Sequence, residues 1–60
     1  MPIISVELFK GRSRRQRQEF AKAVTQAAVS ILKAPLTHTW VIFKEHPKSY
    51  WAMGGKLCDG

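Results

Sequence analysis

Two residues near the start of this 60-residue chain could do chemistry together, Pro2 and Arg12. Removal of Met1 would leave Pro2 as a secondary amine at the chain terminus. Burial in an apolar pocket beside a cation lowers the pKa of such an amine, which could then act as a base near neutral pH. The alternative is that Met1 stays and Pro2 only begins an edge strand, where its missing N–H does no harm.

Arg12 stands in a turn that joins a strand to a helix, beside the unpaired N–H groups of the helix start. A guanidinium at that place can bind a carboxylate through two parallel hydrogen bonds. Arg14, Arg15 and Arg17 crowd the same helix start, where the helix dipole disfavours cations, and we interpret them as solvated. We therefore single out Arg12 as the carboxylate ligand.

Other polar residues of the second half are weaker candidates. His38 and His46 are interpreted as loop or surface histidines without a placed partner. Glu45 could orient a water molecule for hydratase or dehalogenase chemistry, although nothing in its spacing requires this. Lys44 and Lys48 are most simply solvated.

The elements that position the first half follow from hydrophobic periodicity and capping residues. Apolar residues alternate with a period of two over Pro2–Phe9, which predicts a strand with one face on a core. Ser13 and Gln16 match the capping box, so that a helix begins there. Pro35 cannot continue a helix, which should therefore end near Lys33.

In the second half, β-branched and aromatic residues over Thr39–Lys44 predict another strand. A strand, a helix and a strand form a βαβ unit, which is parallel in nearly all known cases. Tyr50–Met53, the Gly54-Gly55 turn and Lys56-Leu57 predict a short C-terminal hairpin. The predicted fold class is α/β (α+β), in a single domain over residues 1–60.

One helix on a two-stranded sheet leaves the other sheet face bare. Ile3, Phe9, Val41 and Phe43, or their neighbours, would then meet water, and a second copy should cover them. A lone domain of this size buries only about 60% of its unfolded surface, which also favours partner subunits.

Composition limits the class of protein. Ten Lys and Arg against four Asp and Glu give a net charge of +6, which favours an anionic partner: nucleic acid, an acidic subunit or a small carboxylate. The lone Cys58 excludes an internal disulfide, argues against a structural zinc site and fits a reducing compartment. No apolar run approaches the length of a membrane-spanning helix, and a signal peptide is not recognisable, so we expect a cytoplasmic protein.

Five features stand in one register along nearly the whole chain: Pro2, the Gly11-Arg12-Ser13 turn with Gln16, the Ala34-Pro35-Leu36-Thr37 helix exit, Val41-Ile42 and Gly54-Gly55. Taken together, they resemble the 4-oxalocrotonate tautomerase family. The resemblance implies a β-α-β subunit that dimerises into a four-stranded sheet with two helices on one face and assembles into a hexamer, a trimer of dimers. It implies loss of the initiator methionine and transfer of a proton between carbons of an enol or unsaturated keto acid, with no cofactor. Pro2 would be the catalytic base and Arg12 would bind the substrate carboxylate.

Two tryptophans depart from the family pattern. Trp40 stands where the best-known tautomerases have an arginine that polarises the substrate carbonyl, an effect worth about 2 to 4 kcal/mol at comparable sites. Trp51 stands at an aromatic position of the hairpin that is usually phenylalanine. Both favour an apolar or aromatic substrate such as an aryl enolpyruvate over the eponymous diacid, with Trp51, Trp40 and Leu8 as substrate-binding residues. Each tryptophan could instead pack in a core or subunit interface, and Lys44 or Lys48 of a neighbouring subunit could replace the missing cation.

We therefore predict a cofactor-free, homo-oligomeric tautomerase, an isomerase of small keto or enol acids. The alternative is a subunit without activity of its own in a mixed hexamer, because the strand arginine is absent and an acidic partner would offset the charge of +6. A third hypothesis, a small basic nucleic-acid-binding protein, would require steep salt dependence. The second half argues against it, since no second helix with basic or amide side chains follows Pro35.

Overall fold

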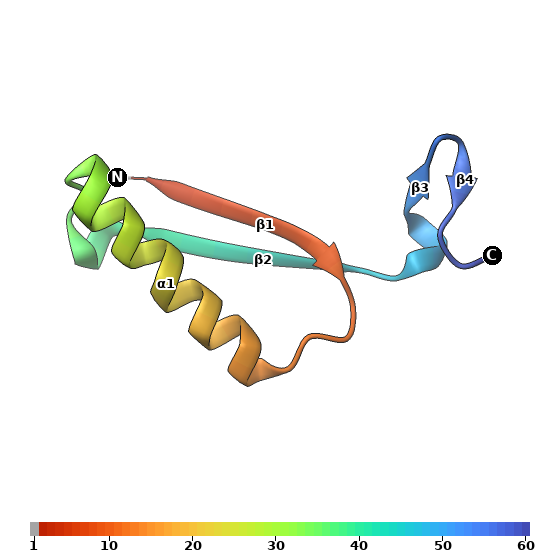
Figure 1. Ribbon diagram of the computed structural model, residues 1–60, viewed down its shortest axis with the longest axis horizontal. Helices are drawn as coiled ribbons and strands as arrows, with labels where there is room; N and C mark the ends of the chain where they lie inside the picture. Colours follow the sequence, from red (N-terminus) through yellow and green to blue (C-terminus); the bar gives the residue numbers. More distant parts are fainter. Residues whose placement is uncertain (1) are drawn as a thin grey trace.

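The computed structural model of the chain describes residues 2–60, so that the expected removal of Met1 concerns a residue outside them. Figure 1 shows two long strands side by side, a helix across one of their faces and a small hairpin beyond their far end. This is the predicted β-α-β arrangement with a C-terminal hairpin, an α+β fold. In chain order the helix and strands are β1 (Ile3–Phe9), α1 (Arg14–Leu32), β2 (Trp40–His46), β3 (Ala52–Met53) and β4 (Lys56–Leu57).

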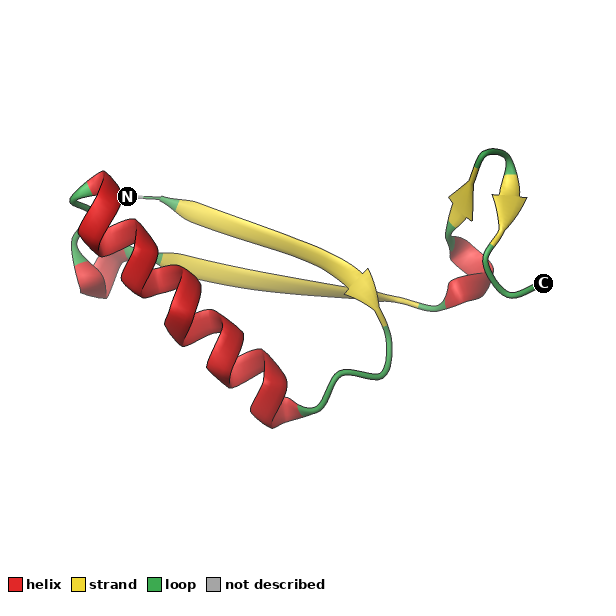
Figure 2. Cartoon of the chain, in the orientation of Figure 1, coloured by secondary structure: helices red, strands yellow, loops and turns green. Residues whose placement is uncertain are grey.

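Two three-residue 3₁₀ turns, which the sequence did not predict, flank β2 (Figure 2). The first, Leu36–His38, connects the helix exit to β2, and the second, Lys48–Tyr50, leads from β2 into the hairpin. The hairpin strands are accordingly shorter than expected. Tyr50 lies in the second turn and not in a strand.

The two long strands pair in parallel, as predicted, with Ile3 opposite Trp40 and Phe9 opposite His46. Backbone hydrogen bonds continue past both ends of this ladder. The N–H of Trp40 donates to the carbonyl oxygen of Pro2 at 3.1 Å, and the N–H of Lys10 donates to that of His46 at 3.1 Å. Pro2 is thereby fixed to the strand end as an extension of the sheet.

The prediction that the second strand ends at Lys44 is wrong, because β2 continues through Glu45 and His46. These two polar residues lie opposite Leu8 and Phe9 in the ladder. Backbone pairing with β1 satisfies the N–H and C=O groups of both residues, although polar side chains have a low preference for strands. The strand therefore extends to the end of β1.

Helix α1 begins and ends where the sequence predicts. Its N-cap, Ser13, accepts from the Gln16 N–H at 3.1 Å, and the Gln16 side chain accepts from the Ser13 N–H at 2.8 Å. This is the predicted capping box, which satisfies two donors at the helix start. Lys33 closes the other end with a left-handed backbone, φ +60°.

The register divides the side chains of the sheet between two faces. Ile4, Val6 and Leu8 face α1, and the rings of Phe43 and Phe20 meet edge to face at 6.3 Å. The opposite face, called here the open face, is not covered by the helix. It carries Ile3, Ser5, Glu7 and Phe9 from β1, and Trp40, Ile42, Lys44 and His46 from β2.

The expectation that Val41 and Phe43 meet water is corrected by this register. They pair with Ile4 and Val6 on the helix side, and both are half-buried. Their neighbours Trp40 and Ile42 take the open face, where 51% and 41% of their surfaces remain exposed.

The isolated subunit has almost no closed core. Ala28 is the one apolar residue of residues 2–60 that is buried, at 5% exposure. The radius of gyration is 14.3 Å, against about 10 Å for a compact chain of this length. The accessible surface is 4950 Å², against about 4,000 Å² for a typical folded chain of the same mass. Within residues 2–60, α1 is not apolar enough to be a membrane span.

Candidate active site

The turn between β1 and α1 gives Arg12 its position. Gly11 has φ +122°, a backbone region that residues with side chains rarely adopt, and this sharp bend places Arg12 just before the helix start. Arg17, one turn into α1, donates from Nη1 to the carbonyl oxygen of Arg12 at 2.8 Å and lies 3.8 Å from the carboxylate of Glu45.

Arg17 is therefore not the solvated residue that we predicted. Only 31% of its side chain is exposed. Arg15 does lie in solvent, 88% exposed, beside Glu19. Glu45, the proposed water-orienting residue, points to the helix side and meets Arg17 there.

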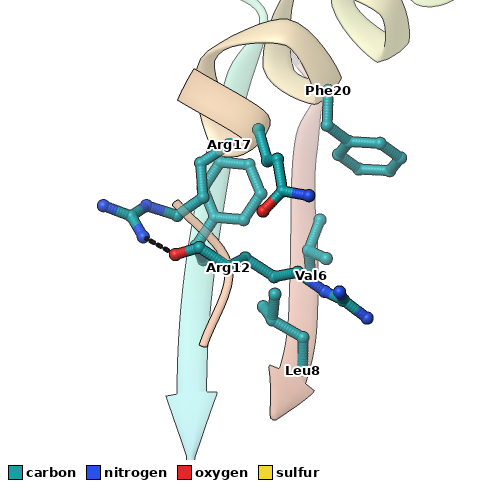
Figure 3. A pocket seen from close by; sticks show the side chains of 7 residues that line it. Val6, Leu8, Arg12, Arg17 and Phe20 are labelled. Atoms are coloured by element: carbon teal, nitrogen blue, oxygen red, sulfur yellow. Dashed lines mark hydrogen bonds between the residues drawn. The ribbon is translucent and has the colours of Figure 1, made fainter. Parts of the chain in front are cut away.

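A cleft of about 270 Å³ opens between the helix start and the sheet. Figure 3 shows the Arg12 side chain extending alongside Val6 and Leu8, while its backbone carbonyl turns toward Arg17. The cleft therefore combines an apolar wall with guanidinium groups at its rim, which suits an acid that carries an apolar group. Its lining residues are Val6, Leu8, Arg12, Gln16, Arg17, Phe20 and Phe43.

Trp51 lies on the open face at the end of β1. Its ring packs against that of Phe9 with centroids 4.5 Å apart and planes at 60°. The backbone carbonyl of Trp51 accepts from the Cys58 N–H at 2.8 Å, so that the hairpin is tied to the same point. Lys48 adds a cation 5.7 Å from the centre of the Phe9 ring.

His46 has a partner that the sequence did not predict. Its Nε2 lies 2.9 Å from Oε1 of Glu7, and its ring meets that of Trp51 edge to face at 5.7 Å. A shallow cleft of about 330 Å³ joins Glu7, His46 and Trp51 with Tyr50 and Ala52. Sequence reasoning missed this group because it placed His46 beyond the strand. His38, by contrast, is exposed in the first 3₁₀ turn, as expected.

The predicted site residues lie at opposite ends of the sheet. Pro2 and Trp40 stand where β1 and β2 begin, whereas Leu8, Arg12 and Trp51 stand where β1 finishes (Figure 1). Seven residues of strand separate the two groups by about 20 Å. A single subunit therefore does not bring Pro2 and Arg12 together.

Among residues 2–60, no three His, Cys, Asp or Glu side chains gather in a way that could hold a metal ion.

Comparison with known proteins gives one consistent result. The family model described as "Tautomerase enzyme" matches residues 2–59. A 2-hydroxymuconate tautomerase of Pseudomonas putida is 37% identical over 59 residues, which cover 98% of this chain and 94% of the relative.

Solved structures agree with the fold. One is TomN, a 4-oxalocrotonate tautomerase homologue in the tomaymycin biosynthetic pathway, at 34% identity, TM-score 0.93, and coverage of 97% of this chain and 89% of that chain. Another is a heterohexamer 4-oxalocrotonate tautomerase from Chloroflexus aurantiacus J-10-fl, at 30% identity, TM-score 0.92, and coverage of 98% and 95%.

Proposed function

Because the chain belongs to the tautomerase family, whose model matches it from Pro2 to Asp59, we propose that it is a tautomerase with Pro2 as its base. The carrying observation is that the match begins at Pro2, which the ladder holds at the strand end through its bond with Trp40. The substrate is a small enol or unsaturated keto acid. We propose that residues 1–60 form a single domain. The reaction requires only the transfer of a proton between atoms of the substrate.

The active site is proposed to form between copies of the chain. In residues 2–60 no third strand pairs with the outer edge of β1, and two such edges can pair in antiparallel fashion about a twofold axis. That pairing sets the start of one β1 beside the finish of the other. Pro2 of one copy then lies near Leu8, Arg12 and Trp51 of the second, which removes the separation of about 20 Å. Pairing through β2 would leave Pro2 away from these residues.

The exposed apolar surface supports assembly beyond this dimer. A four-stranded sheet still leaves its open face uncovered, including Ile3 at 56% exposure, Trp40 and Ile42. Packing of three such dimers against one another would bury these three apolar residues, which supports the hexamer that the family resemblance implies.

In the proposed mechanism, removal of Met1 frees the Pro2 amine. The neutral amine takes a proton from a carbon next to the substrate carbonyl and returns it at another carbon. Arg12 of the second copy binds the substrate carboxylate, and its positive charge favours the neutral state of the amine. Trp51 excludes water from the reacting atoms. The apolar wall of the cleft, with Leu8, supports a substrate with an apolar or aryl group, such as an aryl enolpyruvate.

A mixed hexamer is the second candidate. A heterohexamer is among the structural neighbours, and this chain has a net charge of +6. An acidic partner chain could offset that charge and could also supply the arginine that is missing at Trp40. In that case the purified chain alone would be inactive and would bind a second, acidic tautomerase-like chain.

The decisive experiment combines the intact mass of protein purified from cells, labelling with 3-bromopropiolate and ketonisation of phenylenolpyruvate. We expect a mass lacking Met1, one label on the Pro2 amine, and loss of turnover on labelling. Pro2→Ala should lower kcat by about a hundredfold. Arg12→Ala should raise KM by roughly tenfold to a hundredfold, with partial recovery in Arg12→Lys, because lysine lacks the bidentate fork. Full turnover with Met1 retained would refute the role of Pro2.

A further inference from the structure

The pair of His46 and Glu7 on the open face is not used by the reaction described so far. Its separation of 2.9 Å is a direct hydrogen bond between β2 and β1. In the isolated subunit 35% of the His46 side chain and 58% of the Glu7 side chain are exposed, so that neither is closed off by its own chain.

The hydrogen bond assigns separate roles to the two ring nitrogens. The Glu7 oxygen accepts, so Nε2 of His46 donates to it both in the neutral imidazole and in the imidazolium. The second ring nitrogen, Nδ1, is then the one that gains or loses a proton and can face a substrate. A carboxylate that orients an imidazole in this way is the arrangement by which triads hold their base in the working tautomer.

The pair shares its cleft with the aromatic residue proposed to cover the substrate. Glu7, His46 and Trp51 line the same cleft of about 330 Å³, and the His46 ring meets Trp51 at 5.7 Å. Trp51 in turn packs on Phe9 at 4.5 Å. A ligand that touches Trp51 from the open side would therefore meet His46 as well.

In the proposed dimer the pair also faces Pro2. Antiparallel pairing of two complete β1 strands sets Ile3 of one copy opposite Phe9 of the other. His46 of that other copy lies one strand further along the same face. Two strand spacings therefore separate the backbone at the start of β1 in one copy from the backbone of His46 in the other, a distance of about 10 Å. One small keto acid can span this distance.

We propose that His46, oriented by Glu7, is the acid that protonates the substrate carbonyl oxygen, in place of the strand cation that is absent at Trp40. This rests on the proposed function of Pro2. The Pro2 amine takes the proton from carbon, and the electron pair of the C–H bond forms the new C=C bond. The carbonyl π pair moves to oxygen, which takes the proton from Nδ1 of the His46 imidazolium.

The sequence of transfers then closes without a further reactant. When the Pro2 ammonium delivers its proton to a second carbon, the enol hydroxyl returns its proton to Nδ1, and both groups regain their first state. Ketonisation of an enol runs the first step in reverse, from the Pro2 ammonium and the neutral imidazole. It leaves the proton on His46, and exchange with water returns the proton to the amine before the next turnover.

The test uses His46→Gln and Glu7→Gln, each with a matched control. His38→Gln makes the same change at the other histidine, and Glu19→Gln removes an exposed carboxylate that pairs with Arg15. We expect His46→Gln to lower kcat for phenylenolpyruvate about a hundredfold, with little change in KM. Glu7→Gln should lower kcat about tenfold, because an amide can present either oxygen or NH₂ and no longer fixes the tautomer.

Three further measurements distinguish catalysis from a structural role. The double variant should be no worse than His46→Gln, because the two residues act as one unit. At a pH high enough to make the imidazole neutral, nitrogen NMR should show hydrogen on Nε2 in the wild type and a mixture of tautomers in Glu7→Gln. The rate of Pro2 labelling by 3-bromopropiolate should be unchanged in both variants, because the pair acts on the substrate oxygen and not on the amine.

The inference is overturned if the His46→Gln assembly keeps wild-type kcat while Pro2→Ala loses it. It is also overturned if the loss tracks dissociation in light scattering and disappears at higher protein concentration, since His46 would then only hold subunits together. Wild-type turnover in Pro2→Ala would instead refute the proposed function. Four charged or titratable side chains lie around His46 and would contribute to the dependence of kcat on pH. They are Glu7, Lys44 opposite Glu7 in the ladder, Lys48 near Phe9 and Tyr50 in the cleft.

Discussion

Arg17 holds the backbone of Arg12: its Nη1 donates a hydrogen bond of 2.8 Å to the Arg12 carbonyl oxygen. The same guanidinium lies 3.8 Å from Glu45 on β2. The turn that carries the proposed carboxylate ligand is thus tied both to α1 and to the sheet. This tie explains why one of four clustered arginines is partly buried while Arg15 beside it is not.

Arg17→Met is expected to loosen that turn without touching substrate. A hydrogen bond from a charged donor is worth about 1.5 to 3 kcal/mol, so KM for a carboxylate substrate should rise about tenfold while kcat changes little. Steady-state kinetics check this, with Arg14→Met as the control from the same exposed helix start. Equal effects in both variants would mean that net charge, and not the bond to Arg12, matters.

Trp40→Arg tests the departure from the family pattern. Trp40 is half exposed beside Ile3 at the start of the sheet, so that a longer polar side chain can be placed there without opening a core. The new cation should raise kcat/KM for dicarboxylic enol substrates about a hundredfold relative to monocarboxylic ones. Trp40→Phe, which removes bulk without adding charge, should leave this ratio unchanged. A similar ratio in both variants would place position 40 outside the active site.

Ile42→Glu should break the assembly. Ile42 lies in the middle of the open face, and a carboxylate buried there without a partner costs several kcal/mol. Light scattering should show a smaller particle, and turnover should fall with it, because the proposed site needs two copies. Gln26→Glu adds the same charge on the exposed side of α1 and serves as the control. An Ile42→Glu protein of wild-type mass would show that the open face is not an interface.

Ser13→Ala should destabilise the helix start. It removes the oxygen that accepts from the Gln16 N–H, a cap whose loss costs about 1 kcal/mol. Urea unfolding at a fixed protein concentration measures the free energy of unfolding. In Ser30→Ala the lost bond runs to the Gln26 carbonyl inside the helix, at 3.0 Å, and the change should stay within about 0.5 kcal/mol. A larger loss in the control would contradict the capping interpretation.

The local structure was determined by the sequence because its signals involve only neighbouring residues. The capping box needs Ser13 and Gln16 three positions apart. Pro35 stops the helix because its ring removes the backbone N–H and clashes with the preceding turn. The period of two over β1 and the residue types of β2 predicted both strands. The same residues, read together, carried the family resemblance that the match over residues 2–59 confirms.

Only the tertiary structure decided which residues meet. Register between two strands whose paired residues are 37 positions apart, as in Ile3 and Trp40, is a long-range property. A slip of one residue moves every side chain to the other face. It placed Phe43 toward the helix, extended β2 to His46 and so gave His46 its bond to Glu7. It also put Pro2 and Arg12 at opposite ends of the sheet, because both flank the same straight strand. No local pattern encodes that separation, which is why the proposed site takes residues from two copies of the chain.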